Sequence, residues 1–469
     1  NNVWGKISLI LISLISNATC PCTSTAQSRK NILFIVADDL TCRLGCYNDP
    51  IVQSPNIDRL ASKGLRFERA YCQYPLCNPS RASFMTGRRP ATTGVTENRT
   101  HFRNALPDVI TLPQLFQNNG YHVARTGKIF HYGVPGQIGT SGFDDPPSWN
   151  EVANPKGRDR IFENRIKNIT PQFNLGIALA YLEDERDEFE QTDAMVATEA
   201  IRFMEENKER PFFIATGFFR PHVPSVAPSQ YFDRYKFEDI HLPETPPVDR
   251  PSFPSVAHDY FEPNYSLQSN ELRTFTRAYL ATISFMDAQV GRLLEALDRL
   301  KLSEKTIVVF FSDHGWLLGE HGGQWQKRSL YEESARVPLI IYAPGQGGNG
   351  ATCYRTVELI DLFPTLAELC DLAIPNGVEG TSLKVLLEEP AGNWNKPAIT
   401  DLVRRKDRSI QAGINGRSVR TERYRYTEWD EGKQGIELYD TYSDPNEWYN
   451  LAEEPRYKDT IKHLAALLR

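Results

Sequence analysis

Two short apolar runs, each followed directly by acidic residues, constrain the fold of this chain most strongly. The first lies in NILFIVADDL (31–40) and stops at Asp38 and Asp39. The second lies in TIVVFFSDHG (306–315) and stops at Asp313. An uninterrupted apolar run of this length predicts a strand that is buried on both faces, as in a parallel sheet. We therefore expect both runs to be central strands.

Helical patterns alternate with these strands. A third strand is predicted in RPFFIATGFFRPH (210–222), and helices are predicted at 54–64, 112–120, 273–300 and 357–370. Strands that alternate with helices favour an α/β fold, in which helices sandwich a large, mixed but mostly parallel sheet. In such sheets the ligand site lies beyond the carboxyl ends of the strands, where the acidic residues stand.

The pattern changes after about residue 375. Alternating polar and apolar residues at 409–429 and 437–452 predict antiparallel strands. We therefore predict a catalytic α/β domain at 29–374 and a smaller C-terminal α+β domain at 375–469 that carries an antiparallel sheet. Residues 134–200 are polar and irregular, and we expect them to form surface insertions.

The first 28 residues have the character of a signal peptide. Lys6 precedes the apolar run ISLILISLIS (7–16), and small polar residues follow it. A membrane-spanning helix needs about 20 apolar residues, so this run predicts export without a transmembrane span. Lipidation at Cys20 is a less favoured alternative, because Asn17-Ala18-Thr19 is a poor lead-in.

The net charge and the cysteine content limit which classes of partner we expect and whether disulfides can form. The net charge is −6 and the chain has no long basic block, so we expect no nucleic-acid partner. An anionic substrate would have to be held by local lysines and arginines. Beyond the signal peptide stand Cys42, Cys46, Cys72, Cys77, Cys353 and Cys370. Disulfides are possible in an exported protein, but the count does not fix a pairing.

The acidic residues at the strand ends predict a metal site. Asp38, Asp39, Asp313 and His314 would converge if their strands were neighbours in one sheet. Three unpaired carboxylates would repel one another, and a divalent cation would relieve this. Oxygen-rich ligation favours calcium or magnesium over zinc. The alternative for each pair is a helix cap or a turn.

Three further segments supply basic residues. GKIFHYG (127–133) places Lys128 and His131 three residues apart, FRPHVP (219–224) holds His222 between two prolines, and a glycine-rich loop carries Lys327. Lysine can bind an oxyanion, and histidine can move a proton near neutral pH. A surface lysine or a packed histidine is the commoner explanation for each one alone.

Cys77 opens the segment CNPSRASFMTG (77–87). Pro79 and Ser80 suit a helix start, which would place the thiol where the helix dipole favours negative charge. From these residues alone, the Cys77 thiol could form a disulfide or act as a nucleophile. A cation, basic residues and one unusual cysteine together predict hydrolysis of a charged ester, without separating sulfate from phosphate.

The segment Cys77-x-Pro79-Ser80-Arg81, followed by Thr86-Gly87-Arg88, resembles the signature of the type I sulfatases of the alkaline phosphatase superfamily. The motifs ADD, CxPSR, GKxxH, PH and SDHG also occur in the order that the family has. SDHGWLLGEHG, GKIFH and RPHVP are most similar to the iduronate-2-sulfatase-like branch, which includes bacterial polysaccharide sulfatases.

The resemblance implies a role for each matched residue. A maturation enzyme would convert Cys77 to formylglycine (3-oxoalanine). Calcium, or less favourably magnesium, would be held by residue 77 with Asp38, Asp39, Asp313 and His314. Arg81 would steady the formylglycine hydrate, Lys128 and Lys327 would bind the sulfate oxygens, His131 would assist the hydrate, and His222 would act as general acid. One hydroxyl of the hydrate attacks sulfur, and the other expels sulfate as the carbonyl re-forms.

The resemblance also implies a sulfated carbohydrate substrate, such as a carrageenan-type galactan or a glycosaminoglycan. Arg99, His101 and Arg103 lie shortly after the signature, and we expect them to contact neighbouring anionic sugars. The protein would be periplasmic or secreted, or would enter a lysosome-like compartment in a eukaryote. The alternatives are a phosphonate or phosphodiester hydrolase of the same superfamily and a catalytically dead polysaccharide-binding relative.

Overall fold

The structure is a computed structural model that describes residues 29–244, 253–258, 261–405 and 413–469. The predicted signal peptide at 1–28 lies outside the described residues. Among the described residues, no helix combines the length and the apolar character needed to cross a membrane.

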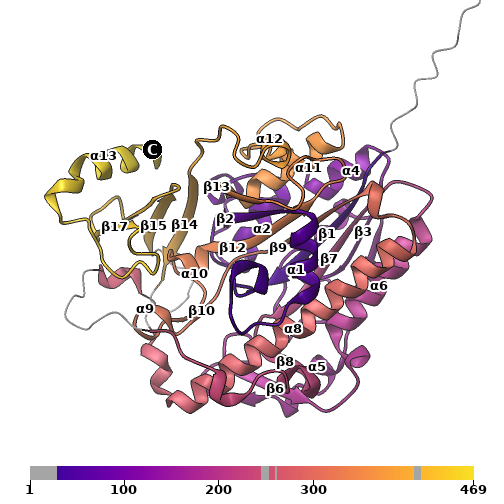
Figure 1. The fold of residues 1–469 in the computed structure, drawn as a ribbon, viewed down its shortest axis with the longest axis horizontal. Helices are drawn as coiled ribbons and strands as arrows, with labels where there is room; N and C mark the ends of the chain where they lie inside the picture. Colours follow the sequence, from indigo (N-terminus) through magenta and orange to yellow (C-terminus); the bar gives the residue numbers. More distant parts are fainter. Residues whose placement is uncertain (1–28, 245–252, 259–260, 406–412) are drawn as a thin grey trace, which may run out of the picture.

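An eight-stranded sheet forms the centre of the molecule (Figure 1), in the order β13-β2-β12-β9-β1-β7-β3-β4. Only β12 runs antiparallel to its neighbours, and the other pairs are parallel. The predicted mixed, mostly parallel sheet is therefore confirmed. Its strands are β1 (Asn31–Asp38), β2 (Leu65–Tyr71), β3 (His122–Gly127), β4 (Glu151–Ala153), β7 (Phe212–Pro221), β9 (Thr306–Ser312), β12 (Arg336–Tyr342) and β13 (Thr352–Glu358).

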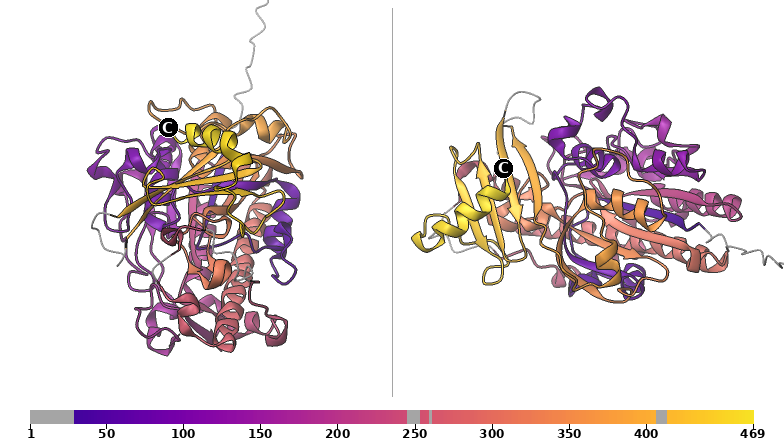
Figure 2. Two further views of the ribbon diagram at one scale, coloured as in Figure 1. Left: turned by 90° about the vertical axis from the view of Figure 1, so that its left-hand side faces the viewer. Right: turned by 90° about the horizontal axis from the view of Figure 1, so that it is seen from above.

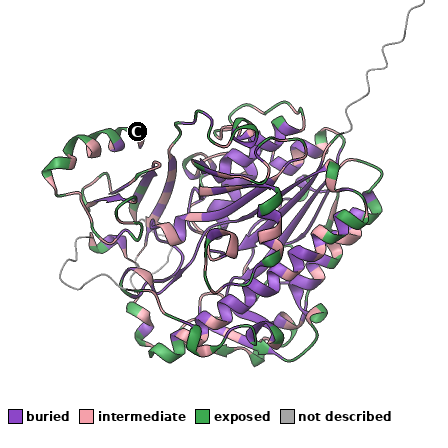
Figure 3. Cartoon of the chain, viewed as in Figure 1, coloured by how far each residue is buried: buried purple, intermediate pink, exposed green. Residues whose placement is uncertain are grey.

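Helices cover both faces of this sheet, which explains its uninterrupted apolar runs. Side chains of β1 alternate between two cores: Leu33 and Ile35 belong to one, Ile32 and Phe34 to the other. Figure 3 shows the buried sheet between helices whose outer faces are exposed. The first core is covered by α1 (Pro55–Lys63), α6 (Thr192–Asn207) and α8 (Ser269–Arg299); the second by α2 (Cys77–Thr86), α4 (Leu112–Asn118), α11 (Leu362–Leu369) and α12 (Lys384–Glu388).

The predicted helices at 54–64, 112–120 and 273–300 are present as α1, α4 and α8. The prediction at 357–370 is partly wrong. Val357 and Glu358 are the last residues of β13, where they pair with Ala70 and Tyr71 of β2. A short 3-10 turn then leads into α11. The apolar pattern spans both elements because strand and helix are buried in the same core.

Four antiparallel strands form a second sheet beside the first one (Figure 2), as predicted. They are β14 (Ala398–Arg404), β15 (Ile414–Arg420), β16 (Tyr424–Trp429) and β17 (Ile436–Asp440), and α13 (Lys458–Leu467) packs on them. The position of the domain boundary at residue 375 stays a prediction.

The predicted insertions at 134–200 are more ordered than their polar composition indicates. They contribute β5 (Lys167–Asn168) and β6 (Ala180–Asp184), which join β8 (Ser225–Pro228) in a three-stranded sheet. Ala178, Leu179 and Ala180 are fully buried. The remaining short elements are α3 (Pro90–Thr93), α5 (Arg158–Ile161), α7 (Ser229–Phe232), α9 (Glu320–Gly323), α10 (Glu332–Ala335), β10 (Leu317–Leu318) and β11 (Trp325–Gln326).

The register of the central strands brings the predicted site together. Ala37 of β1 pairs with Ser312 of β9, so Asp38 and Asp313 follow each other side by side. On the other side of β1, Asp38 pairs with Pro221 of β7. The carboxyl ends of these strands therefore open onto one place, as expected for a parallel sheet.

Candidate functional site

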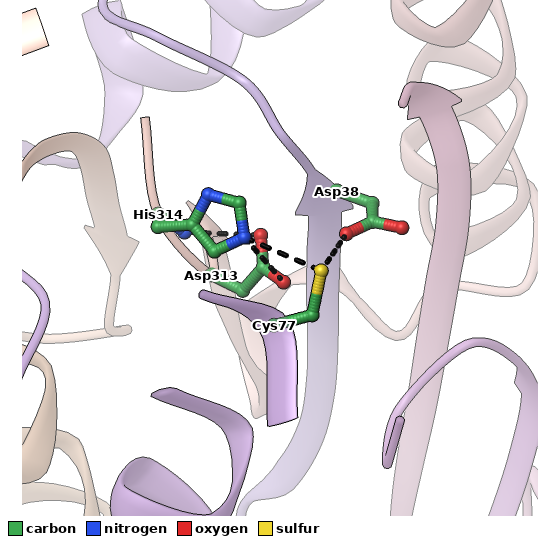
Figure 4. A group of neighbouring side chains, drawn as sticks. All are labelled: Asp38, Cys77, Asp313 and His314. Atoms are coloured by element: carbon green, nitrogen blue, oxygen red, sulfur yellow. Dashed lines mark hydrogen bonds and ion pairs between the residues drawn. The ribbon is translucent and has the colours of Figure 1, made fainter. Parts of the chain in front are cut away.

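Cys77 lies at the centre of the site, surrounded by residues from two strand ends (Figure 4). Its Sγ atom is 3.5 Å from Asp38 Oδ1 and 3.3 Å from His314 Nε2. The candidate ligand atoms of Asp38, Cys77, Asp313 and His314 all lie within 4.8 Å of one another. A second group, with the same limit, combines Asp38 and Cys77 with Asp39 and His222.

Helix α2 presents Cys77 at its first position, as the Pro79-Ser80 pattern predicted. All ten of its residues are buried. Ser80 Oγ donates a hydrogen bond to the Asp313 carbonyl oxygen, 2.5 Å away. The helix start is thereby tied to the end of β9.

Arg81 connects the strand ends from inside the protein. Its guanidinium group is fully buried, and its Nε donates to Asp313 Oδ2 at 2.9 Å. Its NH2 lies 3.3 Å from Asp38 Oδ1. Its NH1 donates to the carbonyl oxygens of Lys128, at 2.6 Å, and Ile129, at 3.0 Å. One side chain thus fixes the ends of β1 and β9 and the segment after β3.

Two lysines reach the acidic residues from opposite sides. Lys128 Nζ lies 2.5 Å from Asp38 Oδ2, and Lys327 Nζ lies 2.7 Å from Asp39 Oδ1. Lys128 follows Gly127, whose left-handed backbone (φ 71°) passes so close to β7 that an added Cβ would lie 2.1 Å from the Gly217 oxygen. Glycine is therefore required there to bring Lys128 into the site.

The positive charge around Cys77 changes the ionisation of its thiol. Burial alone would raise the pKa of Cys77, but Lys128, Lys327 and His314 outweigh burial and hold the pKa well below its ordinary value. Lys327 Nζ lies 3.2 Å from Sγ. The position of residue 77 therefore stabilises negative charge.

The carboxylates fit a bound cation. Burial raises the pKa of the Asp313 carboxyl to about 6, against the opposing effect of Arg81. Asp39 Oδ2 is buried and accepts no hydrogen bond from the described residues. One buried carboxylate oxygen thus lacks a hydrogen-bond donor among the described residues, and the oxygen-rich donors suit a hard divalent ion. This cluster is therefore a possible metal site.

Two histidines complete the shell around residue 77. His131 is buried beside Cys77, and burial lowers its pKa to about 4. His222 Nδ1 donates to the Val223 carbonyl oxygen at 2.5 Å. This bond fixes the orientation of the His222 ring and leaves its Nε2 atom 3.6 Å from Asp39 Oδ2.

A cavity of about 640 Å³ opens above this cluster, a size suited to a small ligand. His131, His222 and Lys327 lie at its inner end. Its other lining includes apolar side chains and arginines, among them Tyr74, Leu76, Val134, Arg99, Arg328 and Arg405. The site therefore lies at the bottom of a pocket with both apolar and cationic walls.

Of the three residues predicted after the signature, only Arg99 lines this cavity. Arg103 instead pairs with Asp145, with Nε 2.5 Å from Oδ1, and donates to the Pro107 carbonyl oxygen. His101 accepts a hydrogen bond from the Arg103 backbone nitrogen and stacks on Phe102. We therefore do not carry His101 and Arg103 forward as substrate contacts.

Tyr74, Arg328 and Arg405 were not predicted individually as lining residues. Tyr74 lies three residues before Cys77, and Arg328 directly follows Lys327. Their proximity to the motifs could therefore have predicted that both line the site. Arg405 comes from the C-terminal sheet region, and only the structure brings it near the cavity. Disulfides are absent among the described residues, where Cys42, Cys46, Cys72, Cys77, Cys353 and Cys370 are all free.

Comparisons with known proteins agree with this geometry. The family described as "Sulfatase" matches residues 30–372, and the family described as "N-sulphoglucosamine sulphohydrolase, C-terminal" matches residues 319–469. Human iduronate 2-sulfatase is 33% identical over 98% of this chain and 98% of its own length. A sulfatase from Formosa agariphila is 33% identical over 94% of this chain and 86% of its own length.

Two solved structures share the fold. One is a protein in complex with its substrate D-glucosamine-2-N,6-O-disulfate; its TM-score is 0.75, at 24% identity, covering 94% of this chain and 97% of that one. The other is a phosphonate monoester hydrolase from Silicibacter pomeroyi. Its TM-score is 0.76 at 22% identity, and the match covers 93% of this chain and 94% of that one. At these identities the likeness concerns the fold alone.

Proposed function

Because this chain belongs to the sulfatase family and is a sulfuric ester hydrolase, we propose that it removes sulfate from a sulfated carbohydrate, using a formylglycine made from Cys77 and a calcium ion. The observation that carries the proposal is the convergence of Asp38, Asp313 and His314 on Cys77 at the bottom of a cavity. Relatives named for sulfated sugars support a carbohydrate substrate.

Calcium would be held by residue 77 with Asp38, Asp39, Asp313 and His314. When bound, it supplies positive charge that offsets the charge developing on the sulfate group. The convergence of these ligand atoms, and the buried Asp39 Oδ2 without a hydrogen-bond donor in the described part of the chain, support this assignment.

Formylglycine, as its hydrate, supplies a nucleophilic hydroxyl and a second hydroxyl through which the aldehyde is regenerated. The chain holds this residue by its own contacts. Arg81, bonded to Asp38 and Asp313, keeps the charges around residue 77 in place. His131, which lies beside residue 77 and lines the cavity, would take a proton there.

The two lysines would bind the sulfate oxygens. Lys128 and Lys327 approach residue 77 from different segments, so a sulfate group between them would be held in one orientation. Fixed cations of this kind stabilise charge in the transition state more than in the ground state.

His222 would donate a proton to the ester oxygen that leaves with the sugar. The Val223 carbonyl oxygen can only accept, so Nδ1 carries a hydrogen and Nε2 is the atom that faces the site. A sugar alkoxide is a poor leaving group, and general acid catalysis there typically contributes about 10²–10⁴-fold.

The cavity supports recognition of the sugar beyond the sulfate. Its apolar side chains can pack on a sugar ring, and Arg99 can contact a neighbouring anionic group. Export to the periplasm or beyond, or to a lysosome-like compartment in a eukaryote, and conversion of Cys77 by a separate maturation enzyme complete the proposal.

Matched substrates test the proposal against a phosphonate or phosphodiester hydrolase. The protein, produced with a maturation enzyme, is assayed on 4-nitrophenyl sulfate and on bis(4-nitrophenyl) phosphate, with Cys77→Ser as the inactive control. We expect a higher kcat/KM for the sulfate ester, and a higher value for the phosphodiester would refute the proposal. Mass spectrometry of the peptide that contains Cys77 tests the alternative of a catalytically dead polysaccharide-binding protein. That alternative predicts an unmodified Cys77 thiol in protein from the native host.

A further inference from the structure

The backbone around Lys327 adopts a conformation that side-chain-bearing residues rarely take. Gln326 (φ 75°) and Arg328 (φ 70°), on either side of Lys327, both lie in the left-handed region. Residues other than glycine pay a steric cost there, and they persist only when the surrounding structure holds them. The loop that carries Lys327 therefore depends on contacts from elsewhere.

Some of these contacts come from the catalytic domain itself. Gln326 donates a side-chain hydrogen bond to the Ile177 carbonyl oxygen. The backbone nitrogen of Arg328 donates to the Pro75 carbonyl oxygen at 3.1 Å. These bonds fix the two left-handed residues but leave the segment that follows them to be held by other elements.

The C-terminal sheet holds that following segment. Leu330 packs in an apolar cluster with Trp429 of β16. Tyr331 donates through its hydroxyl to Glu437 Oε1 of β17 at 2.9 Å. The backbone nitrogen of Glu332 donates to Glu447 Oε2 at 3.0 Å. Three consecutive residues, 330–332, are thus held by β16, β17 and the turn that follows β17.

Glu332 is the centre of a buried ion cluster at this junction. Its Oε1 accepts hydrogen bonds from Arg420 Nε at 2.8 Å and from Arg425 NH2 at 2.5 Å. The Tyr71 hydroxyl also donates to it, at 2.9 Å. Arg425 in turn pairs with Glu447 at 2.5 Å. Both arginines are at least 95% buried, and the Glu332 side chain is 13% exposed, so these charge-assisted hydrogen bonds hold one geometry.

The same sheet also holds the segment that leads to Cys77. Thr400 donates through its hydroxyl to the Cys72 carbonyl oxygen at 2.7 Å, and the Val403 backbone nitrogen donates to the Tyr74 hydroxyl at 2.8 Å. Both contacts come from β14. One sheet therefore contacts the approaches to residue 77 and to Lys327.

We infer that Glu332 is a positioning residue for the sulfatase reaction: through Arg420, Arg425 and Glu447 it couples the C-terminal sheet to the Lys327 loop and sets where the lysine stands relative to residue 77. The inference rests on the proposed role of Lys327 in binding sulfate. Glu332 is not among the residues that line the cavity, so it can act on catalysis only through other residues. We assign that action to Lys327, and a cycle with Lys327 distinguishes it from a path through the segment that leads to Cys77.

A double-mutant cycle measures this coupling. The proteins are the wild type, Glu332→Gln, Lys327→Ala and the double variant, assayed on 4-nitrophenyl sulfate with calcium and with the conversion of residue 77 quantified in each. We expect Glu332→Gln to lower kcat/KM about 10- to 100-fold, because small displacements of catalytic groups cost that much. In the Lys327→Ala background the same change should alter kcat/KM by less than about threefold.

Hydrogen exchange provides a readout independent of activity. Glu332→Gln should speed exchange of the amides at 326–332, while amides in the core of β1 stay unchanged. Arg423→Gln is the matched control. Among the described residues, the side chain of Arg423 hydrogen-bonds only to Asp440 of β17, and it is half exposed. It should leave both kcat/KM and exchange at 326–332 as in the wild type.

The outcomes separate the inference from the proposed function. Equal losses from Glu332→Gln in both backgrounds, or no loss in either, would overturn the inference. A Lys327→Ala variant with wild-type activity would refute the proposed role of Lys327, and the inference with it. If Glu332→Gln does not fold, Tyr331→Phe, which removes only the bond to Glu437, takes its place in the same cycle with the same criteria.

Discussion

Replacing Arg81 by methionine should destabilise the protein strongly without calcium and less strongly with it. Methionine keeps much of the side-chain volume but removes every polar contact of the guanidinium group. Asp38 and Asp313 then lose their shared cation, and the carbonyl oxygens of Lys128 and Ile129 lose their donor.

The size of the effect follows from the burial of these groups. Arg81, Asp38 and Asp313 are all fully buried, and removing one partner of a buried ion pair costs about 3–5 kcal/mol. With about 2.1 cal/mol/K of unfolding entropy per residue, the 469 residues give about 1 kcal/mol per degree. The variant should therefore melt about 3–5 °C below the wild type.

Scanning calorimetry in a calcium-free buffer, and again with saturating calcium, measures this difference. Calcium should narrow it, because the bound ion gives the two carboxylates a new partner. Arg88→Met is the control, since among the described residues the Arg88 side chain donates one hydrogen bond, to the Asn376 carbonyl oxygen at 2.9 Å. A variant that melts within about 1 °C of the Arg88→Met control in both buffers would refute the role assigned to Arg81.

Three further predictions follow from the site. Removing calcium with a chelator should lower the melting temperature by about 3 °C, since a ligand at 100 times its Kd stabilises the folded protein by about 2.7 kcal/mol. In the Asp313→Asn variant, calorimetry should find the same melting temperature with and without calcium. A calcium-dependent melting temperature in that variant would contradict the metal site. His222→Ala should lower kcat on a sulfated sugar about 10²–10⁴-fold but much less on 4-nitrophenyl sulfate, whose leaving group needs no proton. Equal losses on the two substrates would argue against a general acid. Arg99→Ala should raise KM about 10-fold for a sulfated oligosaccharide, the cost of about one charged hydrogen bond, and leave KM for the aryl sulfate unchanged. An unchanged oligosaccharide KM would remove Arg99 from the substrate site.

The sequence predicted the structure best where complete burial requires an uninterrupted run of apolar residues. A strand covered on both faces must be apolar throughout, so β1 and β9 could be predicted with their acidic ends. Because both strands are parallel and adjacent, the convergence of Asp38 and Asp313 followed from the fold class. Helix α2 could be placed because Pro79 and Ser80 mark a helix start.

Contacts between polar residues of distant segments could not be predicted. In β16 the alternation of polar and apolar residues fits a solvated polar face, yet Arg425 is 1% exposed because it faces Glu332 at the start of α10. Periodicity gives the face of a strand but not what covers it. The position of Arg103 shortly after the signature suggested a substrate contact, but its side chain forms an ion pair with Asp145. Proximity in sequence does not show which partner a polar side chain will bind.

The complete burial of α2 also has a consequence for the order of events in the life of the chain. An enzyme that converts Cys77 must reach the thiol and read its neighbours, and the finished fold encloses all ten residues of this helix. If the proposed conversion takes place, it would therefore have to precede the closing of the fold around α2. Folding and maturation then compete in time, and a chain that folds first would trap an unconverted cysteine inside an otherwise complete site.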